Sequence, residues 1–129
     1  MRTAPTVLLV EDEKLLLWSL GRRLREAGYE VLGAGDGREA LDFITGPDQT
    51  PIDLVLLDVV LPDASGLDLL KTIKECRRDC PVILMTAYGT RETIIQALED
   101  GAAQVVGKPF DIDDAVRLVD SMLRRSRGP

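Results

Sequence analysis

The chain has 129 residues, which suffices for one domain with a full core and is too short to be expected to hold a second. Its hydrophobic share of 45% and charged share of 29% are ordinary for a globular protein, and its net charge of -6 disfavours contact with a nucleic-acid backbone. The apolar run at residues 7–10 is too short for a signal peptide or a membrane span. We therefore expect one cytoplasmic domain over residues 1–129, with no membrane and no direct nucleic-acid contact.

Short apolar segments alternate with helical patterns along the chain, which is typical of βα units built around a parallel sheet. The segments are rich in Val, Ile and Leu and show little alternation, as in strands that are covered on both faces. The expected strands are Thr6–Val10, Glu30–Ala34, Leu54–Leu57, Val82–Thr86 and Gln104–Val106. The sequence therefore predicts an α/β fold with helices on both faces of a parallel sheet.

Helical patterns with recognisable ends lie between these strands. The expected helices are Lys14–Ala27, Gly37–Ile44 capped by Asp36, one opened by Ser65 with Leu67, Leu70 and Ile73 inward, one from the cap Thr90 through Asp100, and Ile112 to about Arg125 capped by Asp111. Ser65 and Asp68 have the spacing of a capping box, and Gly28 and Gly101 are expected stops. All connections are short, so no second domain is expected within a loop.

The C-terminal residues 124–129 form a short basic end, which is either a linker stub or a solvated helix terminus. The sequence has no histidine, so Cys76 and Cys80 have no partner that would complete a zinc site. We expect two reduced cysteines at a helix end and its loop, with redox sensing as the alternative.

Charged side chains follow three of the predicted strands. Glu11 and Asp12 come after the first strand, Asp58 after the third, and Lys108 after the fifth. Because parallel strands point their carboxyl ends the same way, these residues are expected to converge on one crevice. Crowded carboxylates favour a divalent cation with oxygen ligands, so the sequence predicts a Mg²⁺ site.

The charges of this crevice suit phosphoryl transfer. Three carboxylates, one lysine and one Mg²⁺ sum to zero, so a phosphoryl group can approach without net repulsion. Glu11 and Asp12 are adjacent and can share the metal, whereas Asp58 stands alone and is the expected nucleophile. Attack by Asp58 on phosphorus would give an aspartyl phosphate, a reactive and therefore temporary mark.

A hydroxyl and an X-Pro bond complete the pattern. Thr86 ends the fourth strand and could donate to a phosphoryl oxygen only when one is present. Lys108 precedes Pro109, and such a bond can be cis in a tight turn. Taken singly, each residue has an ordinary alternative: Asp12 or Glu13 could cap a helix, a threonine suits a strand, and Lys-Pro suits a turn. Taken together they are specific, since caps alone require neither the lysine nor the hydroxyl.

On these residues the chain resembles the receiver domains of bacterial two-component response regulators. The similar segments are VLLVEDE (7–13), LVLLDVVLPDASG (54–66), PVILMTA (81–87) and GKPF (107–110). The resemblance covers about residues 5–123 and implies a doubly wound, flavodoxin-like (CheY-like) sheet of order 2-1-3-4-5. The segment MTAYGT (85–90) is most similar to receivers of AAA+ transcriptional activators.

The resemblance also implies residue roles and partners. It implies Asp58 as phosphoacceptor, Thr86 as switch hydroxyl, Lys108 as phosphoryl-binding cation, and Glu11, Asp12, Asp58 and the backbone carbonyl of Val60 as Mg²⁺ ligands. The donor would be a sensor histidine kinase, and phosphorylation would stabilise another conformation of the fourth helix, fifth strand and fifth helix. That surface would control an output domain or partner protein, in transcriptional regulation, and could also form a phosphorylation-dependent homodimer.

Two surface features add hypotheses. The family usually has Tyr or Phe three residues before the lysine, where this chain has Val105, so Tyr88 is a candidate for the output surface; an ordinary loop tyrosine is the alternative. At 100° per residue, Leu15 and Trp18 point away from the buried face of the first helix. We expect them to help dock the phosphohistidine domain of the kinase, unless Trp18 folds over neighbouring loops.

Two other functions fit part of this residue pattern. A phosphatase of the haloacid dehalogenase type needs a second Asp two residues after the nucleophile, and Val60 stands there. A receiver-like domain that no longer uses phosphate would not need all five polar residues that this chain has. We therefore expect a domain that catalyses only its own phosphorylation and dephosphorylation and turns over no metabolite.

Overall fold

The computed structural model describes residues 4–46, 50–87 and 89–127. Strands and helices alternate along this part of the chain, as predicted. In order they are β1 (Thr6–Val10), α1 (Lys14–Glu26), β2 (Glu30–Ala34), α2 (Gly37–Thr45), β3 (Leu54–Asp58), α3 (Gly66–Cys76), β4 (Val82–Thr86), α4 (Arg91–Glu99), β5 (Gln104–Gly107) and α5 (Ile112–Arg127). Among the described residues, no helix combines the length and hydrophobicity that crossing a bilayer requires.

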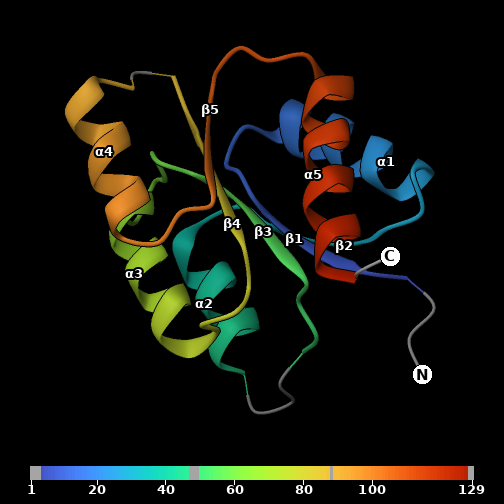
Figure 1. Cartoon of the computed structure of the whole chain (residues 1–129), viewed down its shortest axis with the longest axis horizontal. Helices are drawn as coiled ribbons and strands as arrows, with labels where there is room; N and C mark the ends of the chain where they lie inside the picture. Colours follow the sequence, from blue (N-terminus) through green and yellow to red (C-terminus); the bar gives the residue numbers. More distant parts are fainter. Residues whose placement is uncertain (1–3, 47–49, 88, 128–129) are drawn as a thin grey trace.

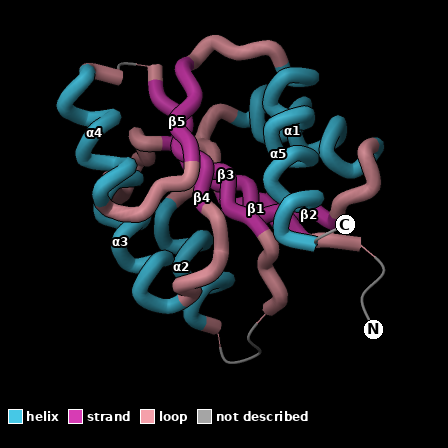
Figure 2. The backbone as a smooth tube through the Cα atoms, in the orientation of Figure 1, coloured by secondary structure: helices cyan, strands magenta, loops and turns pink. Residues whose placement is uncertain are grey.

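The five strands form one parallel sheet of order β2-β1-β3-β4-β5, which confirms the predicted topology. The sheet runs through the middle of the molecule between two layers of helices (Figure 2). Helices α2, α3 and α4 cover one face, and α1 and α5 cover the other (Figure 1). All carboxyl ends of the strands therefore lie at one edge, where parallel α/β sheets bind their ligands.

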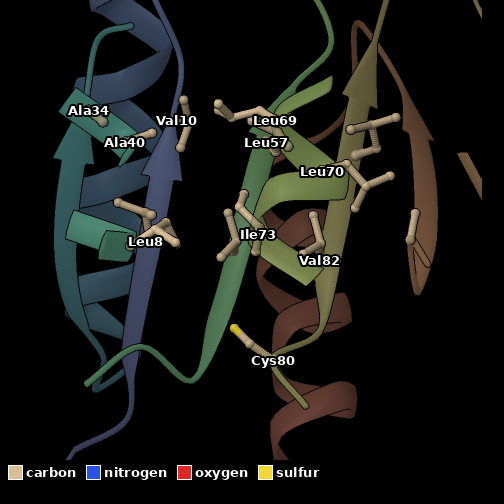
Figure 3. Packing of buried hydrophobic residues seen from close by; sticks show 14 of the residues in the cluster. Leu8, Val10, Ala34, Ala40, Leu57, Leu69, Leu70, Ile73, Cys80 and Val82 are labelled. Atoms are coloured by element: carbon tan, nitrogen blue, oxygen red, sulfur yellow. The ribbon is translucent and has the colours of Figure 1, made fainter. Parts of the chain in front are cut away.

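Each face of the sheet has its own hydrophobic core. On β1, Leu8 and Val10 pack toward α2 and α3, while Val7 and Leu9 pack toward α1 and α5. The same alternation continues along β3 and β4, so that these strands are buried on both sides. Figure 3 shows part of the first of the two cores, with labelled side chains of β1, β3 and α3 on one face of the sheet.

Several element ends differ from the prediction by one or two residues. Strands β3 and β5 each extend one residue further, so that Asp58 is itself in the sheet. Helix α1 ends at Glu26, and Ala27, predicted as its last residue, is the exposed C-cap. Helix α5 continues to Arg127 rather than to about Arg125. Helix ends are set by the capping contacts, which periodicity alone does not specify.

The predicted caps and stops are in place. Asp36 and Thr90 accept hydrogen bonds from the third N–H of α2 and α4, and the stops Gly28 and Gly101 have φ of 103° and 109°. Ser65 caps α3, but its hydroxyl accepts from the N–H of Leu67, so the contact differs from a capping box with Asp68.

Cys76 and Cys80 are both free, as predicted. Cys76 is the exposed last residue of α3, and Cys80 is buried in the loop before β4.

Candidate functional site

The three predicted strand ends do converge at the carboxyl edge of the sheet. Glu11 follows β1, and its N–H donates to the carbonyl oxygen of Ala34 at 2.9 Å. Asp58 is the last residue of β3. Lys108 follows β5, and its N–H donates to the carbonyl oxygen of Thr86 at 2.7 Å, which fixes where its side chain starts. Sheet hydrogen bonding therefore brings together residues that are up to 97 positions apart.

The Lys108 ammonium bridges two of the carboxylates. Its Nζ lies 2.6 Å from Glu11 Oε1 and 2.8 Å from Asp58 Oδ2. Glu11 has none of its surface exposed, and Asp58 has 5% exposed. Charge-assisted hydrogen bonds at these distances are strong, because little water competes for the groups.

Burial and pairing shift the pKa values of this cluster. Burial raises the pKa of Glu11 above its ordinary value, even though its hydrogen bond with Lys108 acts in the opposite direction. Burial by itself would lower the pKa of Lys108, but the hydrogen bonds to Asp58 and Glu11 outweigh it and raise that pKa. Lys108 is therefore a fixed cation at neutral pH, held by two acids.

Asp12 completes an acidic cluster with these two residues. One carboxylate oxygen from each of Glu11, Asp12 and Asp58 can be chosen so that all lie within 4.8 Å of one another. Glu13 holds the N-cap position of α1 but makes no side-chain capping bond within the described chain, while its N–H donates to Glu11 Oε2 at 2.9 Å. Helix capping by the Glu13 side chain therefore does not explain why residues 11–13 are all acidic.

The loop after Asp58 turns tightly around this residue. The N–H of Val60 donates to Asp58 Oδ1 at 3.2 Å, and the Val60 side chain points outward with 66% of its surface exposed. A Cβ at Gly66 would lie 2.2 Å from the carbonyl oxygen of Asp58, so only glycine allows α3 to begin there. Each Asp58 oxygen thus has its own donor, Val60 for Oδ1 and Lys108 for Oδ2.

The predicted switch residues are placed differently from one another. Thr86 is buried at the end of β4, next to the site. Val105 is half-buried in β5 and packs against the core on the α4 side of the sheet. Tyr88 lies outside the described residues. The peptide bond between Lys108 and Pro109 is cis.

Leu15 and Trp18 are exposed on α1, as the helical periodicity predicts, with exposed fractions of 70% and 59%. The guanidinium of Arg22, one turn further on, stacks over the Trp18 ring at 5.4 Å from its centroid. Beside Leu15 lies a cavity of about 460 Å³ between α1 and the segment that links β5 to α5. Its lining includes Lys108, Pro109 and Phe110.

This cavity was not predicted from the sequence. Its signal was present in Phe110, a large apolar residue directly after Lys108-Pro109, but the cavity arises only when α1 and the end of β5 are placed side by side.

The chain is similar in sequence and structure to known proteins. The family model described as the response regulator receiver domain matches residues 7–120. Among curated proteins, the DNA-binding transcriptional regulator NtrC of Klebsiella pneumoniae is 41% identical over 112 residues, covering 87% of this chain and 23% of that protein. A solved CheY-like receiver domain from Methanospirillum hungatei has a TM-score of 0.88 at 29% identity and covers 94% of both chains.

A second solved structure is the receiver domain of DrrB, a Thermotoga maritima protein, described as BeF3 activated. It has a TM-score of 0.84 at 30% identity and covers 94% of this chain and 98% of that chain.

The flavodoxin-like fold and the acidic site at its carboxyl edge define a class of signalling domain. The chain belongs to the response regulator receiver domains. It spans about half or less of the length of several curated relatives, namely 52%, 23% and 50% of three of them. Two of these relatives are named as probable transcriptional regulatory proteins, and the third is the DNA-binding transcriptional regulator NtrC.

Proposed function

We propose that this domain accepts a phosphoryl group from a sensor histidine kinase onto Asp58, in a Mg²⁺-dependent reaction, and passes the change on to an output domain or partner protein. The observation that carries the proposal is the Lys108 ammonium between Asp58 and Glu11, inside a cluster of three carboxylates. A fixed cation beside a buried carboxylate is what an acceptor of a doubly charged group needs.

The donor set of the acidic cluster fits Mg²⁺. Glu11, Asp12 and Asp58 offer carboxylate oxygens within 4.8 Å of one another, and hard oxygen ligands are those that Mg²⁺ prefers. The backbone carbonyl of Val60 is the proposed fourth protein ligand. When bound, the ion would neutralise charge on the oxygens of the transferring phosphoryl group. Asp12 is exposed at the rim, so a hydrated ion has a route into the site.

In the transfer, a carboxylate oxygen of Asp58 bonds to phosphorus while the bond from phosphorus to the donor imidazole nitrogen breaks. The electron pair of the broken bond stays on the imidazole. Lys108 now holds Asp58 Oδ2, so its ammonium must move from the carboxylate onto the phosphoryl oxygens. It keeps its bond partner Glu11 within reach during that move, which limits the cost of the exchange.

Thr86 is the proposed switch hydroxyl, because it is buried at the end of the neighbouring strand β4. A new phosphoryl oxygen would bias its rotamer and so shift the population of conformations of α4, β5 and α5. Val105 stands where the family usually has Tyr or Phe, so β5 has no aromatic ring at this position to respond to Thr86. Tyr88 is the proposed substitute for that ring. The response would act in transcriptional regulation, through an output domain or a phosphorylation-dependent homodimer.

The kinase is proposed to dock over α1. Leu15 and Trp18 present exposed apolar surface beside the cavity that Lys108 lines, so a partner seated there would lie next to the acceptor. We place this exchange in the cytoplasm and propose no direct contact with nucleic acid. Residues 1–129 would act as one receiver unit, with residues 124–129 as its basic tail or linker stub.

The domain is proposed to catalyse only its own phosphorylation and dephosphorylation. The residue two positions after Asp58 is the exposed Val60, which offers no side-chain acid or base for general turnover of phosphate esters.

Binding of beryllofluoride, a phosphoryl mimic, tests the proposal. Calorimetry should detect binding of beryllofluoride to the wild-type protein only when Mg²⁺ is present, and no binding to Asp58→Asn. Size-exclusion chromatography of the same samples would show whether the bound form dimerises. Equal binding by Asp58→Asn, or no binding by the wild type, would contradict the proposed function.

A further inference from the structure

A carboxylate outside the acidic cluster joins two separate elements. Asp63 lies in the loop between β3 and α3, five residues after Asp58. Its Oδ1 accepts a hydrogen bond from the N–H of Gly37 at 2.8 Å, and its Oδ2 accepts one from the N–H of Arg38 at 3.1 Å. These are the first two residues of α2, the helix that lies beside α3 (Figure 1). The hydrogen bonds also hold the pKa of Asp63 below its ordinary value.

Helix α2 already has a local N-cap. Asp36 Oδ1 accepts a hydrogen bond from the N–H of Glu39 at 2.9 Å. Asp63 takes the two remaining N–H groups of the first turn, which the local cap leaves open. Because the helix start has its own cap, the contact with Asp63 matters most for the position of the loop that carries it.

The loop itself is a small closed unit. The N–H of Gly66 donates to the carbonyl oxygen of Val59 at 2.6 Å, and the N–H of Leu61 donates to that of Ala64 at 3.3 Å. Val60 and Ser65 form an isolated bridge across the loop. Asp63 and Ala64 lie at the tip of this unit, and Val60 lies at its base next to Asp58. These contacts connect the tip to Val60, so the position of one depends on that of the other.

The tip of the loop packs closely against the start of α2 at Gly37. A Cβ added to Gly37 would lie 2.8 Å from the Cβ of Ala64 and 3.2 Å from Asp63 Oδ1. The first distance is shorter than carbon atoms tolerate, so the loop tip would have to shift. The start of α2 and the loop tip thus fit only because residue 37 has no side chain.

We propose that Asp63 is a positioning residue for the metal site. It fastens the tip of the β3–α3 loop to the start of α2 and thereby sets where the Val60 carbonyl stands relative to Glu11, Asp12 and Asp58. The inference rests on the proposed function, since it takes Val60 as a Mg²⁺ ligand. Groups that orient a metal ligand without touching the metal commonly change metal affinity by 10- to 100-fold.

Calorimetric titration of Mg²⁺ tests this role without any phosphorylation. Asp63→Ala should bind Mg²⁺ about tenfold more weakly than the wild type, and Asp63→Asn, which keeps an oxygen acceptor, should lie between them. Asp68→Ala is the matched control, because it removes the same charge from the exposed first turn of α3. It should bind Mg²⁺ as the wild type does.

Gly37→Ala approaches the same contact from α2 and leaves every carboxylate in place. It too should weaken Mg²⁺ binding, and circular dichroism would confirm that each variant is folded. Wild-type affinity in folded Asp63→Ala or in folded Gly37→Ala would overturn the positioning role, as would an equal loss in Asp68→Ala. If the wild-type chain itself fails to bind Mg²⁺, the proposed function fails and the inference falls with it.

Discussion

The two edges of the sheet hold their charges in different ways. At the carboxyl edge, Lys108 bonds to the side chains of Glu11 and Asp58. At the amino edge, Arg77, the C-cap of α3, donates to backbone carbonyl oxygens of Phe43, Ile44 and Thr50 at 2.8 to 3.3 Å. Both sets of contacts join segments that are distant in sequence. The contacts of Lys108 are between side chains, whereas those of Arg77 are between a side chain and the backbone.

This difference separates a site that can rearrange from a structural clamp. The backbone carbonyls of Phe43 and Ile44 lie near the end of α2 and move only if the helix moves, so these two partners of Arg77 are fixed. A carboxylate can change its partner by rotating a side chain, so the bonds of Lys108 can be exchanged for bonds to a phosphoryl group. The comparison predicts that variants at the carboxyl edge change reactivity, whereas variants at the amino edge change stability.

Lys108→Ala should have the largest effect on reactivity. Removing one preorganised group that stabilises developing charge commonly costs 100- to 1,000-fold in rate, so phosphorylation by acetyl phosphate should slow by about 100-fold. The rate is measured by intact-mass spectrometry over time. A rate within a few fold of the wild type would show that Lys108 only pairs with the two carboxylates, and the contrast between the edges would be lost.

Arg77→Ala should lower the free energy of unfolding by about 2 kcal/mol, since it removes charge-assisted hydrogen bonds to backbone carbonyls. Urea denaturation measures this change, with the exposed neighbour in Arg78→Ala as control. Phosphorylation by acetyl phosphate should keep its wild-type rate below the unfolding transition. Loss of phosphorylation in folded Arg77→Ala would break the proposed division between the edges.

Trp18→Ala should separate docking of the kinase from the chemistry at the carboxyl edge. Transfer from a histidine kinase that phosphorylates the wild type should fall about tenfold, as is typical for a buried aromatic contact in an interface. Phosphorylation by acetyl phosphate, which needs no docking, should be unchanged. Leu98→Ala, which removes an exposed apolar side chain from α4, is the control. Unchanged transfer from the kinase would remove Trp18 from the docking surface.

The smallest expected effect is a difference in labelling rate between the two cysteines. It tests how rigid the amino edge of the sheet is. Burial raises the pKa of Cys80 to about 11, so little thiolate exists at pH 8, whereas the Cys76 thiol is exposed. Iodoacetamide at pH 8 should therefore label Cys76 first, and labelling of Cys80 should rise as the pH approaches 11. Peptide mass mapping distinguishes the two sites. Equal labelling rates at pH 8 would mean that this edge opens readily.

Much of the site could be predicted because strand ends are local features. Asp58 and Lys108 were located from the apolar runs that precede them, and parallel strands then place them at one edge. The exposure of Leu15 and Trp18 followed from simple helical geometry.

Contacts that depend on distant segments could not be predicted in the same way. To predict the hydrogen bond from Lys108 to Glu11, one must know the length and direction of both side chains. To predict the hydrogen bond from the start of α2 to Asp63, one must know the path of the loop after β3. Ala27 was predicted as the last residue of α1, yet it is the C-cap after the helix and is exposed. These features are set by tertiary packing, which no local pattern encodes.

Intact-mass spectrometry can detect directly whether Asp58 accepts a phosphoryl group with the help of Mg²⁺. After incubation with acetyl phosphate, the wild-type protein should gain the mass of one phosphoryl group with Mg²⁺ present and none with the metal chelated, and Asp58→Asn should gain none. If the wild-type protein gains no mass, or if the gain persists in Asp58→Asn, then Asp58 is not the phosphoryl acceptor.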